Sequence, residues 1–228
     1  MDYNECDYQE TTPTHYEYTI IANKSELVKN EKTKLVSSQS MDQLTGWCTK
    51  FKAFKLIDLV IEKKAEIVVE VGVWGGRSLV PMAYALKQLG HGKVYGIDPW
   101  SSTASTEGMD KINKDWWGAI DHEIIYQGLA QKIELFELSN YVELIKSTSV
   151  DAEPIADIDL LHIDGNHSEE TSLYDAMKWA PLVKTGGYIV FDDTTWGTTA
   201  KAVKWLDANY TRIADYHEDC DWSIWLKQ

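Results

Sequence analysis

The segment from Ile67 to Leu89 constrains the fold more than any other part of the sequence. The apolar run Ile67–Val71 predicts a buried strand, glycines follow from Gly72 to Gly76, and Leu79–Leu89 has the pattern of a helix. A strand, a glycine loop and a helix in this order bring backbone N–H groups and the positive end of a helix dipole to one point. The segment therefore predicts a site for a small nucleotide-like ligand, with an ordinary turn that binds nothing as the alternative.

The spacing of the glycines argues against a dinucleotide cofactor. The G-x-G-x-x-G fingerprint needs a second glycine two residues after Gly72, where this chain has Trp74. An NAD-linked oxidoreductase is therefore a weak hypothesis.

Length and charge limit the remaining classes of function. A chain of 228 residues is long enough for one α/β domain with a sizeable core. A formal net charge of −14 disfavours nucleic acid as a partner, because binding it requires a basic surface. The three cysteines show no C-x-x-C spacing, and neither a signal peptide nor a long apolar run is apparent, so we expect a cytoplasmic protein without membrane contact.

Strands and helices alternate along the chain after about residue 40. We expect residues 1–40 to form an arm or lid, and residues 41–228 to form one domain with a doubly wound, mostly parallel, seven-stranded sheet that closes in an antiparallel pair. Helices are expected between the strands, one of them over Thr49–Lys64 and another beginning over Tyr141–Lys146. The expected strands are Ile67–Val71, Lys93–Asp98, Ile133–Leu138, Ile158–Ile163, Tyr188–Phe191, Arg212–Tyr216 and Trp222–Leu226.

Polar residues follow several of the expected parallel strands, at the edge where such sheets bind ligands. Asp98 ends the second strand and is suited to accept hydrogen bonds from ribose hydroxyls, although capping of the Pro99 turn is the alternative. Ser139 and Asn140 follow the expected third strand.

Three carboxylates are expected to converge after the fourth and fifth strands. Asp164 ends one strand, Asp192 and Asp193 end the other, and a short turn returns His167 beside Asp164. Unneutralised carboxylates would repel one another, so an oxygen-preferring divalent cation, Mg²⁺ above all, is expected there. The alternative is that the carboxylates only cap a helix and a turn. His162 lies within a strand and is interpreted as a core or lining residue.

The stretch Glu70-Val-Gly72-Val-Trp74-Gly75-Gly76-Arg77-Ser78 resembles the first motif of class I S-adenosylmethionine-dependent methyltransferases. The likeness is greatest to the catechol and macrolide-sugar O-methyltransferase groups. It implies S-adenosylmethionine as cofactor, ribose on Asp98 and the adenine ring near Ser139. The residues that it assigns to cofactor binding are Glu70, Gly72, Trp74, Gly76, Ser78, Asp98 and Ser139.

A second stretch, Asp164-x-x-His167 with Asp192-Asp193, resembles the metal-dependent O-methyltransferases. Catechol-type enzymes have asparagine at the place of Asp193 and lysine at the place of His167, so the likeness is to the macrolide-sugar branch. It implies metal ligation by Asp164, Asp192 and Asp193, with His167 as the general base.

Two hypotheses about function follow. The first is a metal-dependent O-methyltransferase that methylates a hydroxyl of a small acceptor, such as a sugar or natural product, with His167 and Asp164 as catalytic residues. The second is a catalytically silent module that binds S-adenosylmethionine or a nucleoside. The sequence leaves the acceptor and the oligomeric state open, a homo-oligomer included.

Overall fold

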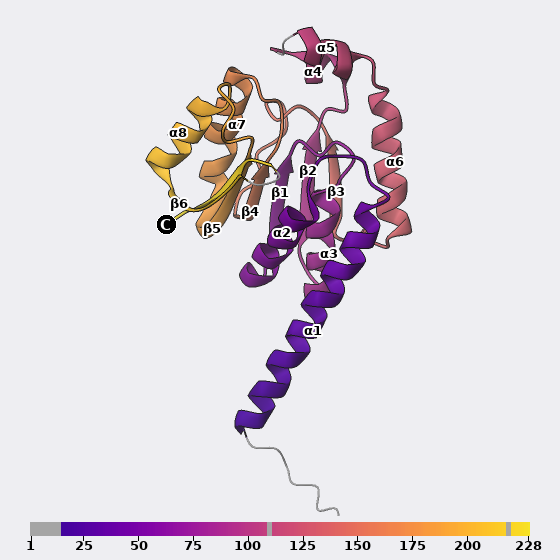
Figure 1. Cartoon of the computed structure of the whole chain (residues 1–228), viewed down its shortest axis with the longest axis vertical. Coiled ribbons are helices and arrows are strands. Elements are labelled where there is room, and N and C mark those ends of the chain that lie inside the picture. Colours follow the sequence, from indigo (N-terminus) through magenta and orange to yellow (C-terminus); the bar gives the residue numbers. More distant parts are fainter. Residues whose placement is uncertain (1–14, 109–110, 218–219) are drawn as a thin grey trace, which may run out of the picture.

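The computed structural model describes residues 15–108, 111–217 and 220–228 of the chain. Their seven strands form one sheet in the order β3-β2-β1-β4-β5-β7-β6 (Figure 1). The first five strands are parallel, and β7 runs antiparallel to both β5 and β6, so the expected fold class is confirmed. The strands are β1 Ile67–Val71, β2 Lys93–Asp98, β3 Val142–Lys146, β4 Ile158–Ile163, β5 Val183–Asp192, β6 Thr211–Tyr216 and β7 Trp222–Leu226.

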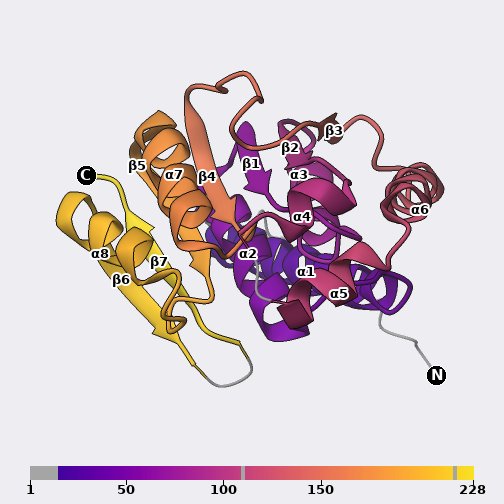
Figure 2. The same ribbon diagram turned by 90° about the horizontal axis from the view of Figure 1, so that it is seen from above.

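Helices cover both faces of this sheet. Figure 2 shows α7 and α8 on one side, with α1 and α2 on the other. The helices are α1 His15–Met41, α2 Lys50–Lys63, α3 Leu79–Leu89, α4 Ser102–Thr106, α5 Lys111–Gly118, α6 His122–Leu135, α7 Glu169–Trp179 and α8 Ala200–Asn209, with a short 3₁₀ turn, η1 Ala180–Leu182, after α7.

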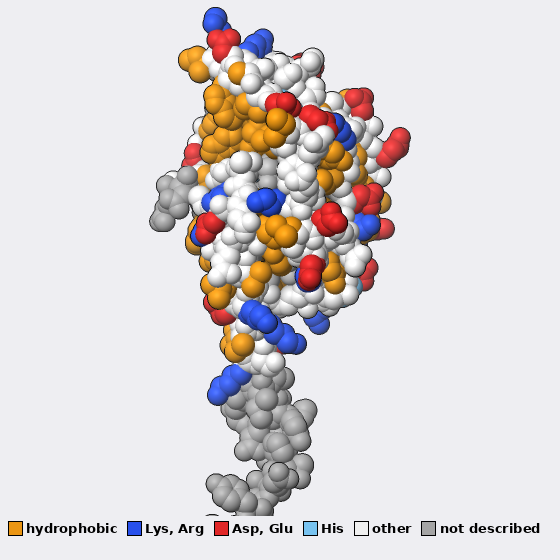
Figure 3. Space-filling model, turned by 90° about the vertical axis from the view of Figure 1, so that its right-hand side faces the viewer, with side chains coloured by type: hydrophobic (Ala, Val, Ile, Leu, Met, Phe, Trp, Pro, Cys, Tyr) orange, Lys and Arg blue, Asp and Glu red, His pale blue; other side chains and the backbone are white. Residues whose placement is uncertain are grey.

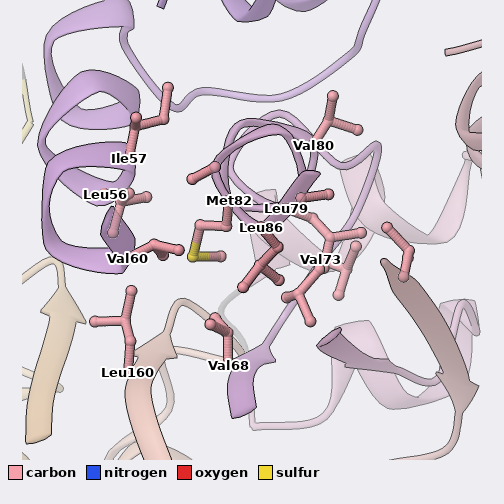
Figure 4. Close-up of a cluster of buried hydrophobic side chains, with 14 of the residues drawn as sticks. Leu56, Ile57, Val60, Val68, Val73, Leu79, Val80, Met82, Leu86 and Leu160 are labelled. Atoms are coloured by element: carbon pink, nitrogen blue, oxygen red, sulfur yellow. The ribbon is translucent and has the colours of Figure 1, made fainter. Parts of the chain in front are cut away.

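Alternation of side chains along the strands divides the core into two layers. Val68, Leu160 and Val190 point to one face, where Leu56 of α2 and Leu86 of α3 pack against the sheet (Figure 4). The intervening residues point to the other face, where Val69, Leu161, Ile189, Trp179 and Leu206 form a second buried cluster with α7 and α8. Replacing a fully buried leucine such as Leu56 by alanine should cost about 2–5 kcal/mol.

Helix α2 illustrates how the sequence specifies these contacts. The side chain of Thr49 caps its first turn by accepting a hydrogen bond from the backbone N–H of Lys52 (3.2 Å). Leu56, Ile57 and Val60 follow at helical spacing and are fully buried against the sheet. Lys52 precedes Leu56 by four residues and therefore lies on the same buried face.

The end of α1 packs against the neighbouring helices. Ser40 Oγ lies 2.8 Å from the hydroxyl of Tyr84 on α3, and Lys34 Nζ donates to Asp58 on α2 (2.9 Å). From this packed end the helix leads away from the sheet (Figure 1). Residues 1–14, the first part of the expected arm or lid, lie outside the described residues.

Two sequence predictions between residues 133 and 146 were wrong. The expected strand Ile133–Leu138 is the end of α6 and the turn after it, and the helix expected from Tyr141 is replaced by strand β3, Val142–Lys146. In α6, Leu129 and Ile133 are both buried at a spacing of four, so the helical period dominates the short alternating pattern. Strand β3 lies at the edge of the sheet with Glu143 and Lys146 exposed, which gives it little apolar signal.

Candidate active site

The glycine loop after β1 and the turn after β4 lie directly against each other. A Cβ atom at Gly72 would fall 2.1 Å from the backbone oxygen of Asp164, and Gly72 has a φ of +85°. The backbone N–H of Asp164 also donates to the oxygen of Val71 (2.8 Å). Glycine is therefore required for close approach, because only a residue without Cβ lets the two motifs form one site.

Gly75 and Gly76 allow the loop to pack closely against other segments of the chain. A Cβ at Gly75 would lie 2.0 Å from Thr45 Oγ1, and one at Gly76 would lie 2.4 Å from Leu129 Cδ1. These positions fix the loop against the segment before α2 and against α6. Gly75 and Gly76 therefore serve the packing of the loop against its neighbours.

Asp98 holds the glycine loop in place. Its Oδ2 accepts hydrogen bonds from the backbone N–H groups of Val73 (3.0 Å) and Trp74 (2.9 Å), and its Oδ1 accepts one from Trp100 (2.7 Å). Burial raises the pKa of Asp98, and these backbone hydrogen bonds oppose the rise. A carboxylate has about four acceptor positions, so Oδ1 keeps capacity for one further donor.

Several residues at this edge hold unusual backbone conformations. Trp74, Trp100 and Asp193 have φ values of +51°, +41° and +52°, in the region that favours glycine. Each such residue costs about 1–3 kcal/mol, and such residues cluster at functional sites. The strand ends are thus shaped at the expense of local stability.

Glu70 and Ser78, both expected to bind the cofactor, are buried. Glu70 is 0% exposed and Ser78 is 5% exposed. The hydroxyl of Ser78 donates to Glu70 Oε1, and the same oxygen lies 2.7 Å from His162 Nδ1. Glu70 Oε2 has no hydrogen-bond partner among the described residues. The Ser78–Glu70 hydrogen bond therefore ties the end of the glycine loop to strand β1.

A row of polar side chains crosses the sheet on the α2 face. Glu70 pairs in register with His162 on the next strand, and His162 Nε2 lies 3.6 Å from Asp192 Oδ1 at the end of β5. Lys52, 1% exposed, forms an ion pair with Asp192 and lies 4.0 Å from Asp164. His162, interpreted from the sequence as a core residue, is fully buried within this row.

The charges of this row shift one another's pKa values. Burial lowers the pKa of Lys52, but Asp192 and Asp164 outweigh it and the net pKa is raised. Burial raises the pKa of Asp164, and the charge of Asp192 adds to the rise. The pKa of Asp192 is lowered, because Lys52 and His162 overcome the effect of its burial. Of Asp164 and Asp192, Asp192 is therefore the carboxylate whose charged form the surroundings favour.

His167 lies beside the carboxylates, as the spacing of its motif predicted. Its Nε2 pairs with Asp193 and lies 4.0 Å from Asp164. Its ring contacts Trp196 edge-on, with centroids 5.1 Å apart. Burial lowers the pKa of His167, but the hydrogen bond to Asp193 and the nearby carboxylates raise it overall.

Ser139 was expected near the adenine ring because it follows the expected strand Ile133–Leu138, and that strand is not present in the structure. Ser139 lies in the turn before β3, at the opposite end of that strand from the crevice. The residue that follows β3 is Ser147, whose N–H donates to the backbone oxygen of Asp98 (3.1 Å). Correct placement of β3 would have identified Ser147 from the sequence.

Lys52 is the site residue that sequence reasoning missed. It comes from α2, and 140 residues separate it from Asp192. The available signal was a lysine on the apolar face of an amphipathic helix, since a lysine is almost never fully buried without a partner.

Aromatic side chains gather beside the glycine loop. Trp74 contacts Trp47 and Trp117, with ring centroids 6.2 and 4.9 Å away, and Trp116 packs on the same group. Trp47 and Trp116 remain 64% and 47% exposed. Figure 3 shows hydrophobic side chains gathered toward the end of the molecule that carries α4 and α5.

Two groups of side chains could hold a metal ion in the part of the chain that the structure describes. His162, Asp164 and Asp192 form one, and Asp164, His167 and Asp193 form the other. In the first group Lys52 already neutralises Asp192, whereas in the second the carboxylates of Asp164 and Asp193 are 31% and 24% exposed. The second group fits an added cation better. The expectation of three unneutralised carboxylates was wrong, because it left out Lys52.

Comparison with known proteins gives the same picture of the fold. The O-methyltransferase NovP superposes with a TM-score of 0.59 at 18% identity, over 76% of this chain and 77% of that one. An O-methyltransferase from Bacillus cereus in complex with SAH gives 0.56 at 15% identity, over 88% and 91%. TomG from Streptomyces achromogenes, an O-methyltransferase in tomaymycin synthesis in complex with SAM, gives 0.58 at 14% identity, over 86% and 89%.

No curated protein sequence matches the chain. None of the helices in the described ranges has the length and apolar character needed to span a membrane. A family model described as a methyltransferase domain matches residues 69–194, which is more than half of the 228 residues and spans both the glycine loop and the carboxylate cluster. The chain therefore belongs to the methyltransferase domain family.

Proposed function

We propose that the protein is an S-adenosylmethionine-dependent O-methyltransferase that acts on a hydroxyl of a small molecule. The observation that carries the proposal is the contact at Gly72, where the glycine loop meets the turn that bears Asp164. Methyl transfer needs the donor and the acceptor to be held side by side, and this contact joins a nucleotide-type loop to a cluster of acid–base residues.

The proposed cofactor site is the strand-end region beside Gly72, Trp74 and Asp98. The free acceptor position on Asp98 Oδ1 suits one ribose hydroxyl, and the strand-end location suits a nucleoside. Solved structures of similar fold contain SAH or SAM, which supports the same choice here. Glu70 and Ser78 act indirectly by supporting the loop.

S-adenosylmethionine supplies an activated methyl group and leaves as S-adenosylhomocysteine. The acceptor oxygen forms the new bond to that carbon as the carbon–sulfur bond breaks, and the hydroxyl proton must leave the oxygen. His167 Nε2 is the proposed acceptor of this proton, and general-base assistance of this kind is worth typically about 10²–10⁴-fold. Asp193, which pairs with Nε2, and Asp164, 4.0 Å from it, hold the imidazole at this position.

Asp164 and Asp193 are the proposed ligands of a divalent cation, with Mg²⁺ the expected ion. Their oxygen atoms and partial exposure suit a hard cation. When bound, such an ion lowers the pKa of an acceptor hydroxyl and fixes its position. A cation on these carboxylates would also relieve His167 of its ion pair, which favours the neutral imidazole that a base requires.

The acceptor is proposed to be small and hydroxylated, such as a sugar or another natural product. A net charge of −14 disfavours nucleic acid. The exposed rings of Trp47 and Trp116 beside the crevice are suited to contact an apolar or ring-shaped acceptor.

A turnover assay tests the proposal. The full-length protein is incubated with methyl-labelled S-adenosylmethionine, Mg²⁺ and a panel of hydroxylated acceptors, and label transferred to an oxygen is measured. Asp164→Asn should abolish transfer, and removing divalent ions with EDTA should stop turnover while S-adenosylhomocysteine binding persists. Label found only on nitrogen or carbon, or no binding of S-adenosylhomocysteine, would overturn the assignment.

A further inference from the structure

Lys52 is buried where the acceptor site meets the core. Its side chain is 1% exposed, and its ammonium contacts Asp192 directly and lies 4.0 Å from Asp164. The ring centroid of Trp222 lies 5.9 Å away on the same side. Placing a lysine there is costly without a charged partner, so the pair with Asp192 must persist in the folded protein.

The two oxygens of Asp192 differ in their surroundings. Oδ2 binds the ammonium of Lys52, whereas Oδ1 is buried 3.6 Å from His162 Nε2, beyond hydrogen-bond distance, and has no hydrogen-bond partner among the described residues. The Asp192 side chain is only 11% exposed, compared with 31% for Asp164 and 24% for Asp193. The three carboxylates are therefore not equivalent, although the sequence alone suggests that they are.

A fixed positive charge also repels a second cation at short range. Lys52 cannot rotate its ammonium into solvent from a fully buried position, and Coulomb repulsion is stronger in a site with little water. A divalent ion bound to Asp192 would have to displace this ammonium or lie beside it. An ion bound between Asp164 and Asp193 neither displaces the ammonium nor lies directly beside it, because the oxygens of these two residues are more exposed.

We propose that Lys52 is a built-in cation of the acceptor site, which keeps Asp192 out of metal ligation and leaves Asp164 and Asp193 as the carboxylate ligands of a divalent ion. The inference rests on the metal site of the proposed function. Lys52 is thus a positioning residue: it neutralises the innermost carboxylate permanently, so that the added ion binds toward the open side of the crevice.

Direct binding of Mn²⁺ to the full-length protein, measured by loss of the free-ion electron paramagnetic resonance signal, tests the inference. The decisive variant is the double substitution Lys52→Met with Asp192→Asn, which removes both members of the pair and leaves no buried charge unpaired. It should bind Mn²⁺ within about threefold of the wild-type affinity, whereas Asp193→Asn should lose at least about tenfold.

Lys52→Met alone extends the test. With the ammonium gone, Asp192 becomes available, so Mn²⁺ affinity should rise at least about tenfold, and adding Asp192→Asn should remove that gain. Lys52→Arg keeps the charge and should leave the affinity near the wild-type value. The double substitution Lys34→Met with Asp58→Asn removes another lysine–aspartate pair, which links α1 to α2 and includes none of the site carboxylates, and serves as the matched control.

The inference is overturned if the double variant at Lys52 and Asp192 loses Mn²⁺ as strongly as Asp193→Asn does, because Asp192 would then be a ligand. It is also overturned if the wild type binds no Mn²⁺ at millimolar concentration. Failure of the proposed methyl transfer is a separate result, since S-adenosylhomocysteine titration and labelled-methyl transfer are measured independently of Mn²⁺ binding.

Discussion

At the scale of single residues, His167 carries the proton transfer of the proposed reaction. Its Nε2 is paired with Asp193 beside Asp164, and it lies outside the residues proposed to hold the cofactor. His167→Ala should therefore lower kcat by about two orders of magnitude while the affinity for S-adenosylmethionine stays nearly unchanged. Steady-state kinetics with a calorimetric titration measures both quantities.

The exposed His91, in the turn after α3, offers a matched control. His91→Ala should leave kcat and cofactor affinity unchanged. If His167→Ala keeps most of its kcat, the histidine only orders the start of α7, and another group removes the proton.

Asp175 makes stability depend on pH. Burial raises the pKa of this α7 carboxyl to about 7, against smaller lowering effects of Ser149 and Lys178. Between these two pKa values the folded state holds a proton on Asp175 that the unfolded chain has lost, so the contribution of this group to stability is greatest at low pH and falls as pH rises from about 4 to about 7. The slope over this range is about 1.4 kcal/mol per pH unit.

Asp175→Asn, which is neutral at every pH, should lack this fall. Relative to the wild type, the variant should gain free energy of unfolding as the pH is raised from 4.5 to 8, measured by urea denaturation at both values. A difference between the two proteins that does not change with pH would mean that Asp175 titrates normally.

The site residues near the strand ends were accessible from sequence because each follows its strand immediately. Asp98, Asp164 and Asp193 all lie where the spacing placed them. Lys52 was missed because its role depends on the packing of α2 over β5, a contact between segments 140 residues apart. The charges that neutralise a buried carboxylate can come from distant parts of the chain. Local spacing suggested that a metal ion neutralises all three carboxylates, whereas Lys52 neutralises one of them.

At the scale of elements, the close contact of the β1 and β4 loops is the structural requirement of the site. Gly72→Ala should lower the free energy of unfolding by more than backbone strain alone, because its Cβ would overlap the Asp164 oxygen. Gly90→Ala is the matched control: Gly90 also has a positive φ, of +78°, but nothing lies within 4 Å of its Cβ position.

The control should lose about 1–2 kcal/mol, the cost of a left-handed conformation, and Gly72→Ala should lose clearly more. Urea denaturation of the two variants gives the comparison. Equal losses would show that the two loops separate at little cost, and the contact would then not define the site.

The order of strands and helices was largely predictable, and the exceptions share one cause. Strands β1 and β4 are largely apolar and lie in the middle of the sheet, so their signal is strong. Strand β3 lies at the edge and its exposure does not alternate, and the end of α6 has a pattern compatible with either structure. Strand β6 lies at the other edge and was still predicted, because its exposure alternates residue by residue, so the cause of the two misses is a local pattern that favours neither period clearly.

At the scale of the whole molecule, a ligand that binds only the folded state should stabilise the protein. S-adenosylhomocysteine at one hundred times its Kd should add about 2.7 kcal/mol, which raises Tm by about 5–10 °C for a chain of this length. NADH at the same concentration should cause no shift, because the glycine loop lacks the dinucleotide spacing. Differential scanning fluorimetry distinguishes the two, and a shift with NADH alone would favour an oxidoreductase.

The most direct measurement of the central claim is a crystal structure of the full-length protein with S-adenosylhomocysteine. We expect the ligand to lie beside Gly72 and Trp74, with a ribose hydroxyl on Asp98 and its sulfur facing the Asp164–His167 turn. That arrangement places the transferred methyl beside the proposed base. Density for the ligand elsewhere, or a sulfur that faces away from this turn, would contradict a methyl-transfer site built from these two loops.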